Sequence, residues 1–443
     1  MDINESGRSH SRQSAAQAGQ KRPFLLAGGQ RLWKLMLPAV LLGVVACDTE
    51  VTNPGPVVDE FLTEPTAFEA LVGGMIFAAA DAQNWIAFDG AVAARELTAS
   101  GGIGAHGFTV LIEQGVLDPI ERNGVWWRGH QARFVAENGI ERFRQGLGAE
   151  FGESRQAASA LVWAGFANRM LGENMCAAVF DGGPAEPSEA HFERALAQFS
   201  EGLEVARAAG EQTLEYAALA GRASVRGWLG DWAGAEQDAE RVPHDFTFDV
   251  PRSLESPDVT TNRFARANQN NPWRSHSVYE TYFEQYYLDS QDPRASWDRD
   301  PDIPLGDGRG IPWYYETKYG ARGEGLTAPI RLTSGAEARL IIAEARLRSG
   351  DWQEALSVLN AMRTDAGVPL RQAAGPDEVW TTLKLERFIE LWLEARALWD
   401  LRRYTQEQIP GDLPEAWDMT GRDLCFPISE DERLTNPNIP VGG

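Results

Sequence analysis

The sequence is poor in the residues that build metal sites. Its 443 residues include only six histidines and three cysteines. The histidines are scattered, and no two of them have the spacing of zinc ligands on one helix. Asp298, Asp300 and Asp302 have the alternating spacing of a calcium loop, but Ile303 stands where that loop needs glycine. The sequence therefore predicts no metal site.

Basic residues are also scarce. The chain has 41 Lys and Arg against 64 Asp and Glu, which gives a formal net charge of -23. Phosphate binding needs a basic surface, so we do not expect a nucleic-acid partner. Apolar residues make up 43% and charged residues 24%, which is ordinary for a globular protein with a large core.

The chain lacks an apolar run of the roughly 20 residues that span a bilayer. The run 35–46 is shorter and is broken by Pro38. Basic residues precede it and Cys47 follows it, which is the order of a secretory signal. Its ending, Val-Val-Ala-Cys, resembles a bacterial lipoprotein box, which implies cleavage before Cys47 and a lipid on its sulfur. We expect a signal peptide over 1–46 and a lipidated tether over 47–62.

Signatures of catalysis are weak or absent. No Gly-x-Ser-x-Gly elbow occurs. Residues 102–107 match the dinucleotide fingerprint, but a helix-like stretch precedes them where a strand is required, so we interpret them as a loop. Glu386, Glu390 and Glu394 lie four apart in an expected helix, where two could form an acid/base pair. Basic residues of the same helix favour a structural ion network instead. We predict a protein that is not an enzyme and holds no cofactor.

Helical periodicity dominates from residue 63 onward, and no long alternating run competes with it. The segment 229–235 reappears in similar form as 349–355, each time after an Ala-rich helix. Gly350 suits the left-handed residue that ends one helix, and Asp351 suits the cap of the next. This repeat resembles the helical hairpin of tetratricopeptide proteins. We expect an all-α fold built on such hairpins, since one hairpin cannot bury its own apolar face. Helices are expected near 85–99, 121–147, 154–179, 188–209, 213–229, 232–242, 334–349, 352–365 and 377–404.

Residues 243–333 differ from the rest. They are rich in Pro, Asn, Asp and Gly and show few helical periods. A loop region this long inside a compact domain usually carries function. Aromatic residues gather in its window 273–319, and those between 279 and 287 have the helical spacing of a buried stripe.

Three aromatics of this window are predicted to bind ligand. Trp297, Trp313 and Tyr314 lie among Pro, Gly and Asp, where no helix can form. Their flat faces suit the apolar faces of sugar rings or peptide side chains. Arg294 and Arg309 could donate to hydroxyl or carboxylate oxygens nearby. We expect Trp313→Ala to weaken ligand binding more than it weakens the fold.

An ordered series of short motifs runs through the last third of the chain. It consists of Asp292-Pro293-Arg294, Lys318-Tyr319, 337–345, Gly350, 359–363, 366–367, Glu386-Arg387, Glu390-Leu391, Glu394, Arg396, 400–403, 425–428 and Asn436-Pro437. Together with the lipoprotein box, this series resembles the SusD/RagB family of nutrient-binding outer-membrane lipoproteins.

The resemblance implies one SusD-like domain over 63–443, with a scaffold of four tetratricopeptide-like hairpins and an irregular, loop-rich ligand face. It implies a lipid-anchored protein of the outer membrane, facing the cell exterior. Such a protein delivers a glycan or peptide to a SusC-like, TonB-dependent barrel transporter. Trp85 resembles an early ligand-binding position of the family, whereas Trp126 and Trp127 resemble helix residues of the core.

Two other functions remain open from the sequence. A helical-repeat lipoprotein could bind a protein partner in a groove between hairpins. A secreted glycoside hydrolase would need two carboxyl groups flanking a cleft.

Cys176 and Cys425 are the cysteines that remain besides Cys47. They could be two buried small hydrophobes, or they could pair, since an exported protein sits where disulfides persist. We predict that they are bonded.

The lipid anchor can be tested directly. Cys47→Ser removes the sulfur that would carry the lipid, so the variant should stay unprocessed or become soluble. Mass spectrometry of the membrane fraction checks the wild-type protein. An unmodified Cys47 in that fraction would contradict the prediction.

Overall fold

The computed structural model describes residues 59–101, 109–269 and 273–440, and most of them are helical. The signal peptide, Cys47 and the glycine-rich segment 102–107 lie outside the described residues. The α-helices are α1 (Phe68–Ala93), α2 (Val110–Glu113), α3 (Asn123–Leu147), α4 (Arg155–Asn174), α5 (Glu189–Ala208), α6 (Gln212–Trp228), α7 (Trp232–Ala239), α8 (Pro257–Thr260), α9 (Tyr282–Ser290), α10 (Gly335–Arg348), α11 (Trp352–Asp365), α12 (Pro376–Glu390), α13 (Ala397–Gln406) and α14 (Glu430–Thr435). Within these ranges, no helix has the length and apolar character needed to cross a membrane.

The strands are short and pair two by two, all antiparallel. They are β1 (Thr98–Ala99) with β5 (His276–Ser277), β2 (Ala177–Val179) with β3 (Ala185–Pro187), β4 (Thr247–Val250) with β8 (Ile330–Ser334), and β6 (Trp297–Arg299) with β7 (Tyr314–Glu316). The strands β4, β5, β6 and β7 lie within the segment 243–333. Short strand pairs and α9 therefore give this loop-rich insert a fixed structure.

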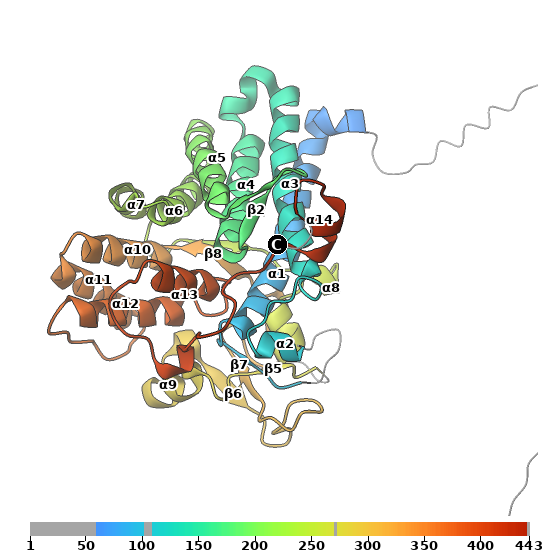
Figure 1. Cartoon of the computed structure of the whole chain (residues 1–443). Helices are drawn as coiled ribbons and strands as arrows, with labels where there is room; N and C mark the ends of the chain where they lie inside the picture. The colour runs from blue at the N-terminus through green and yellow to red at the C-terminus, as the bar shows by residue number, and fades with distance from the viewer. Residues whose placement is uncertain (1–58, 102–108, 270–272, 441–443) are drawn as a thin grey trace, which may run out of the picture. The chain divides into compact units, whose positions relative to one another are not determined.

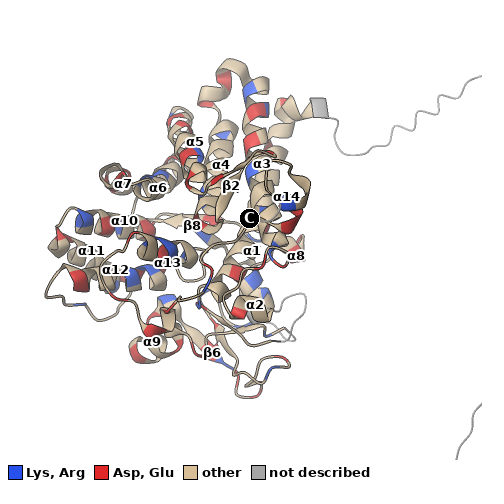
Figure 2. Cartoon of the chain, viewed as in Figure 1, with Lys and Arg blue, Asp and Glu red and all other residues tan. Residues whose placement is uncertain are grey.

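Neighbouring helices pack side by side as hairpins (Figure 1). α1 packs on α3, α3 on α4, α4 on α5, and α6 on both α5 and α7. α10 then packs against α6 and α7 and is followed by α11 and α12. Acidic and basic side chains are interleaved over these helices (Figure 2). The predicted all-α architecture of tetratricopeptide-like hairpins is confirmed.

The two copies of the repeat have the same local structure. Gly230 and Gly350 have φ angles of 88° and 89°, a left-handed conformation that favours glycine. The carboxylate of Asp231 accepts from the backbone N–H of Gly234 at 2.9 Å. The Asp351 carboxylate accepts from the backbone N–H of the equivalent residue at 3.2 Å. Each Asp therefore caps the second helix of its hairpin.

Buried arginines and carboxylates join the helices at the centre of the scaffold. The Nε of Arg403 lies 2.9 Å from Oδ1 of Asp400, and its Nη2 lies 2.8 Å from Oε2 of Glu344 on α10. The Nε of Arg387 on α12 lies 2.9 Å from Oδ2 of Asp400. These side chains are at most 1% exposed. Removing one member would leave an uncompensated buried charge, which typically costs about 3–5 kcal/mol.

The same network reaches α4. The Nε of Arg169 lies 2.8 Å from Oε1 of Glu173, and Arg169 also pairs with Glu337 of α10. Arg396 pairs with Glu173 from the other side. Burial alone would raise the pKa of Glu337, but Arg169 and Arg396 lower it to about 2. The carboxylate is thus held charged inside the protein.

The segment 377–404 is not the single helix expected. A turn separates α12 from α13, and within it Leu393 and Ala395 have φ angles of 62° and 63°. Glu394 lies in this turn, so it does not share a helical face with Glu386. The left-handed backbone at Leu393 and Ala395 is incompatible with a continuous right-handed helix, so the helix breaks here.

The ion-network interpretation of the three glutamates is confirmed, but their cations come from other segments. Glu386 pairs with Arg363, and Oε2 of Glu390 lies 3.2 Å from Nη1 of Arg294. Oε1 of Glu394 lies 2.8 Å from Nζ of Lys318. Arg387 and Arg403 instead bind other carboxylates, whereas Arg402 donates to the backbone carbonyls of Met175 and Gly172.

Cys176 and Cys425 are joined by a disulfide in the structure, with Cα atoms 5.0 Å apart. The backbone around it is also paired. The N–H of Cys176 donates to the carbonyl of Phe426 at 2.9 Å, and the N–H of Phe426 donates to the carbonyl of Asn174 at 2.8 Å. The C-terminal segment is thereby fixed to the end of α4.

We predict that Cys176→Ser with Cys425→Ser lowers the free energy of unfolding by about 2–4 kcal/mol, because the bond closes a long loop of the unfolded chain. Urea unfolding of the oxidised wild-type protein and the double variant measures the difference. A non-reducing peptide map is the control for the bond itself. Two free thiols in the natively purified protein would contradict the prediction.

Candidate ligand-binding site

Four segments that are far apart in the sequence meet to form one irregular surface, which we call the loop face: residues 94–101, 109–116, 273–281 and 297–316. β1 and β5 pair at its centre, and the backbone N–H of Ser100 donates to the carbonyl of Ser275 at 2.9 Å. Gly101 forms a bridge with Gly308.

Close backbone approach explains a glycine of the loop face. A Cβ on Gly101 would lie 2.7 Å from the Cα of Ser275 and 2.8 Å from the carbonyl oxygen of Trp273. Any side chain at this position would force the two segments apart. The glycine therefore serves the assembly of the face itself.

The loop face exposes an aromatic side chain among charged ones. Trp273 is 37% exposed. The neighbouring Arg274 has its Nη2 3.6 Å from Oδ1 of Asp307. Arg309 forms a two-pronged contact with Glu113, with Nη2 2.7 Å from Oε2, and both side chains keep about a quarter of their surface exposed. Arg309 was predicted to bind ligand, and it does lie on the loop face.

Trp313 was predicted to be part of an open platform, and that prediction is wrong because its side chain is fully buried. The guanidinium groups of Arg322 and Arg274 lie 5.0 and 5.9 Å from its ring centroid, and the ring of Tyr315 packs 5.0 Å away. Irregular sequence here does not mean an exposed segment. Trp313 forms the base on which the loop face rests.

Trp297 and Tyr314 stack on each other, with ring centroids 4.8 Å apart and planes 15° apart. Trp297 is only 9% exposed, and its Nε1 donates to the carbonyl of Glu284 at 3.3 Å. Tyr314 is half-buried, and the ring of Tyr279 packs against it edge-on at 5.9 Å. The structure brings these predicted residues together, but mostly against each other.

Trp85 and Arg294 lie away from the loop face. Trp85 belongs to α1, not to a loop, and the guanidinium groups of Arg263 and Arg128 lie 3.5 and 4.6 Å from its ring centroid. Arg294 is held by Asp292 at 2.7 Å and by the glutamates of α12. These contacts hold both side chains in place, and ligand binding by Trp85 and Arg294 stays a prediction.

The residue that the sequence reasoning undervalued is Trp273. It lies within the aromatic window and follows Asn271-Pro272, a turn signal. That context could have separated it from the buried aromatics. Asp307 lies within this window, but nothing in the sequence marks Glu113 as a neighbour of it, because Glu113 meets Arg309 only through a tertiary contact.

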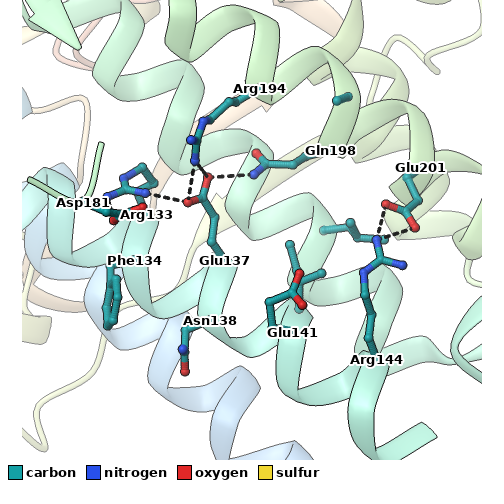
Figure 3. A pocket seen from close by; sticks show the side chains of 13 residues that line it. Arg133, Phe134, Glu137, Asn138, Glu141, Arg144, Asp181, Arg194, Gln198 and Glu201 are labelled. Carbon is teal, nitrogen blue, oxygen red and sulfur yellow. Dashed lines mark hydrogen bonds and ion pairs between the residues drawn. The ribbon is translucent and has the colours of Figure 1, made fainter. Parts of the chain in front are cut away.

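A pocket of about 470 Å³ lies elsewhere, between α3 and α5 with α4 beneath (Figure 3). Glu137 stands at its centre and accepts from Arg133 at 2.6 Å, from Arg194 at 3.2 Å and from Gln198 at 3.0 Å. Arg144 and Glu201 pair at its other end. Its charges largely satisfy one another, which leaves few groups to recognise a ligand.

Comparison with known proteins identifies relatives of this architecture. Residues 268–425 match the model of the SusD family. Among curated proteins, none is similar enough in sequence to count as a match. A SusD-like carbohydrate binding protein from Bacteroides vulgatus has 16% identity and a TM-score of 0.62, over 85% of this chain and 97% of that one.

Two further structures are similar over 85% of this chain and 98% of theirs, both with a TM-score of 0.65. One is a laminarin binding SusD-like protein with 15% identity. The other is surface glycan-binding protein A from Bacteroides thetaiotaomicron, with 13% identity. At these identities the likeness establishes the fold alone.

We predict that Trp313→Ala lowers the free energy of unfolding by about 3–5 kcal/mol, because it opens a cavity at a fully buried position. The matched control is Trp127→Ala, since Trp127 is 44% exposed and its loss opens no cavity. Thermal and urea unfolding measure both. Equal stability of the two variants would contradict the buried placement.

Glu96 anchors the start of the loop face to the scaffold. Its Oε1 accepts from the backbone N–H of Leu393 at 3.1 Å, and its backbone carbonyl accepts from Nε1 of Trp392 at 3.4 Å. Burial raises the pKa of Glu96 to about 8, although the Leu393 N–H and Lys318 both act to lower it. The carboxyl is therefore protonated in the folded protein over much of the neutral range.

Stability should consequently fall as pH rises. The folded protein holds the Glu96 proton more tightly than the unfolded chain, where the pKa is 4.5. The contribution is complete below pH 4.5 and is lost as pH rises from 4.5 to 8. Urea unfolding at pH 5, 6.5 and 8 measures the free energy of unfolding at each pH. In Glu96→Gln, the decrease in this free energy between pH 5 and pH 8 should be smaller than in the wild-type protein by a few kcal/mol. An unchanged slope in the variant would contradict the assignment.

Proposed function

We propose that the chain is a cell-surface glycan-binding protein of the SusD family, anchored in the outer membrane by a lipid on Cys47, that passes its ligand to a TonB-dependent barrel transporter. The match of residues 268–425 to the model of that family supports the proposal. The similar structures include proteins described as binding carbohydrate, laminarin and surface glycan. Those descriptions support a glycan over a peptide as the ligand of this chain.

The observation that carries the proposal is the exposed indole of Trp273 on the loop face. Its surroundings combine an aromatic surface with guanidinium and carboxylate groups, represented by Arg274, Asp307 and Arg309. An indole face stacks on the apolar face of a sugar ring, and the charged groups can bond its hydroxyls. Arg274 follows Trp273 in the sequence and pairs with Asp307, which brings a guanidinium and a carboxylate to the same segment.

The anchor and the transporter are supported by other features. The apolar run that ends at Cys47 supports export and lipidation. The transporter partner is proposed from the resemblance to the SusD family. A detergent pull-down of the native lipoprotein tests it, and recovery of the lipoprotein with no barrel protein would count against it.

One alternative is a scaffold that binds a protein partner between its hairpins. The pocket between α3 and α5 gives this alternative little support, because its charged side chains pair with one another (Figure 3). The third possibility, a glycoside hydrolase, finds less support. A catalytic pair needs carboxyl groups free to face a substrate. Glu386 and Glu390 are instead engaged with Arg363 and Arg294.

The loop-face assignment is tested by titrating a glycan panel that includes laminarin into the purified protein. Trp273→Ala should weaken binding of the best glycan by about thirtyfold, since truncating a stacked aromatic typically costs about 2 kcal/mol. Phe77→Ala is the matched control, because Phe77 is a similarly exposed aromatic on α1 and should leave affinity unchanged. A wild-type protein that binds no glycan of the panel would overturn the proposal.

A further inference from the structure

A second polar pocket, separate from the loop face, lies between α3, the turn of the β2–β3 hairpin and α14. It measures about 480 Å³ and shares no lining residue with the loop face. We call it the α3–α14 pocket. Its lining residues are Asn123, Trp126, Trp127, His130, Gln131 and Phe134 on one side, with Asp181, Asp431 and Glu432 among those facing them.

One wall is an exposed aromatic stripe on α3. Trp127 and Phe134 are 44% and 54% exposed, and Gln131 between them is exposed as well. Residues seven apart share a helical face and are separated by about 10 Å along the axis. The guanidinium of Arg128 lies 4.3 Å from the Trp127 ring centroid and steadies the indole. Trp127 and Phe134 thus present two large aromatic side chains to solvent on one wall of the pocket.

The base of the pocket holds polar atoms that the fold leaves without partners. The buried Nε2 of His130, Oδ1 of Asn123 and Nε of Arg133 accept or donate no hydrogen bond within the described residues. Burial, reinforced by Arg133, lowers the pKa of His130 to about 3, so its ring is neutral and one nitrogen is an acceptor. Unsatisfied buried polar groups are rare in folded proteins. Here they offer both donors and acceptors to a neutral, hydroxyl-rich ligand.

The opposite wall is fixed in place. Nδ2 of Asn436 donates to the carbonyl of Gly183 at 2.9 Å, and Nδ2 of Asn438 donates to the carbonyl of Gly182 at 2.8 Å. The disulfide between Cys176 and Cys425 joins the same two segments further along. The pocket is therefore preformed, and little ordering of the protein is needed when a ligand enters.

We propose that the α3–α14 pocket is a second saccharide-binding site, in which rings of a glycan chain stack on Trp127 and Phe134 while their hydroxyls bond Gln131, His130 and Asn123. The spacing of the two aromatics suits rings that are not adjacent in an extended chain. The ligand class rests on the proposed function, but the site does not depend on the loop face. A long glycan could occupy both sites, which raises its apparent affinity without new contacts.

Other ligand classes fit this pocket less well. No group of three or more metal-ligating side chains occurs anywhere in the described part of the chain. Asp181 is already bound to Arg133 at 2.8 Å, and Asp431 to Asn123, so the carboxylates are not free to hold a cation. The pocket between α3 and α5 offers no comparable aromatic surface beyond Phe134.

The test is native gel electrophoresis of the purified protein in gels containing laminarin, xyloglucan or pullulan. Trp127→Ala and Phe134→Ala should each weaken retention, by up to about thirtyfold in dissociation constant. Trp273→Ala serves as the loop-face comparison, and Trp127→Ala combined with Trp273→Ala should abolish retention. Both positions are exposed, so thermal unfolding should show intact folding. Gln131→Ala provides a second, milder variant of the stripe.

The outcomes separate the two proposals. The second site alone is overturned if Trp273→Ala reduces retention of the protein in the gel while three other variants leave it unchanged. Those variants are Trp127→Ala, Phe134→Ala and Gln131→Ala. Wild-type protein that none of the three glycans retards overturns the proposed function and the second site with it. Retention lost in Trp127→Ala but kept in Trp273→Ala supports the pocket and moves the main site away from the loop face. Binding of a lysine-rich peptide in place of every glycan would assign the pocket to a cationic ligand and overturn the proposal.

Discussion

Arg403 of α13 pairs with Glu344 of α10 and with Asp400 of its own helix. It therefore joins α10 to α13 inside the scaffold. Its partners are buried, so each charge depends on the others for the hydrogen bonds that water would otherwise provide. Arg387 shares Asp400, which couples α12 to the same point. A shift of any one of these helices would leave a buried charge without its partner. The network therefore fixes the register of the hairpins more strictly than apolar packing could, because apolar contacts tolerate sliding.

This rigidity accounts for where the irregular parts of the molecule can be placed. The loop face is attached through Glu96, which bonds the turn between α12 and α13 at Leu393. The far wall of the α3–α14 pocket is attached through the disulfide at the end of α4. Both surfaces are thus built from segments with little secondary structure, and both are held in place by their attachments to the helical scaffold. Binding residues on loops gain affinity when the loops are held in this way.

The scaffold was readable from the sequence because its signals are local. Gly350 and Asp351 predict a turn and a cap from their own chemistry, and the structure has both. Trp313 could not be placed in the same way. Its neighbours in the sequence are turn formers, but its burial depends on Arg274 and Arg322, which approach from other segments. The structure places Arg309 at the surface beside Glu113, and its role in ligand binding stays a prediction, while the exposed Trp273 was not singled out from the sequence.

Exposure, rather than aromatic content, distinguishes structural from recognition residues in this protein. Within the described ranges, Trp127 and Trp273 are the only tryptophans with exposed side chains. One lies on each of the two proposed sites, and neither is needed to fill the core. The acidic chain as a whole repels anions at long range, which disfavours a polyanionic ligand. A neutral polymer with alternating apolar and hydroxyl-bearing faces matches both constraints: it can stack on the two exposed indoles, and it pays no electrostatic penalty on approach.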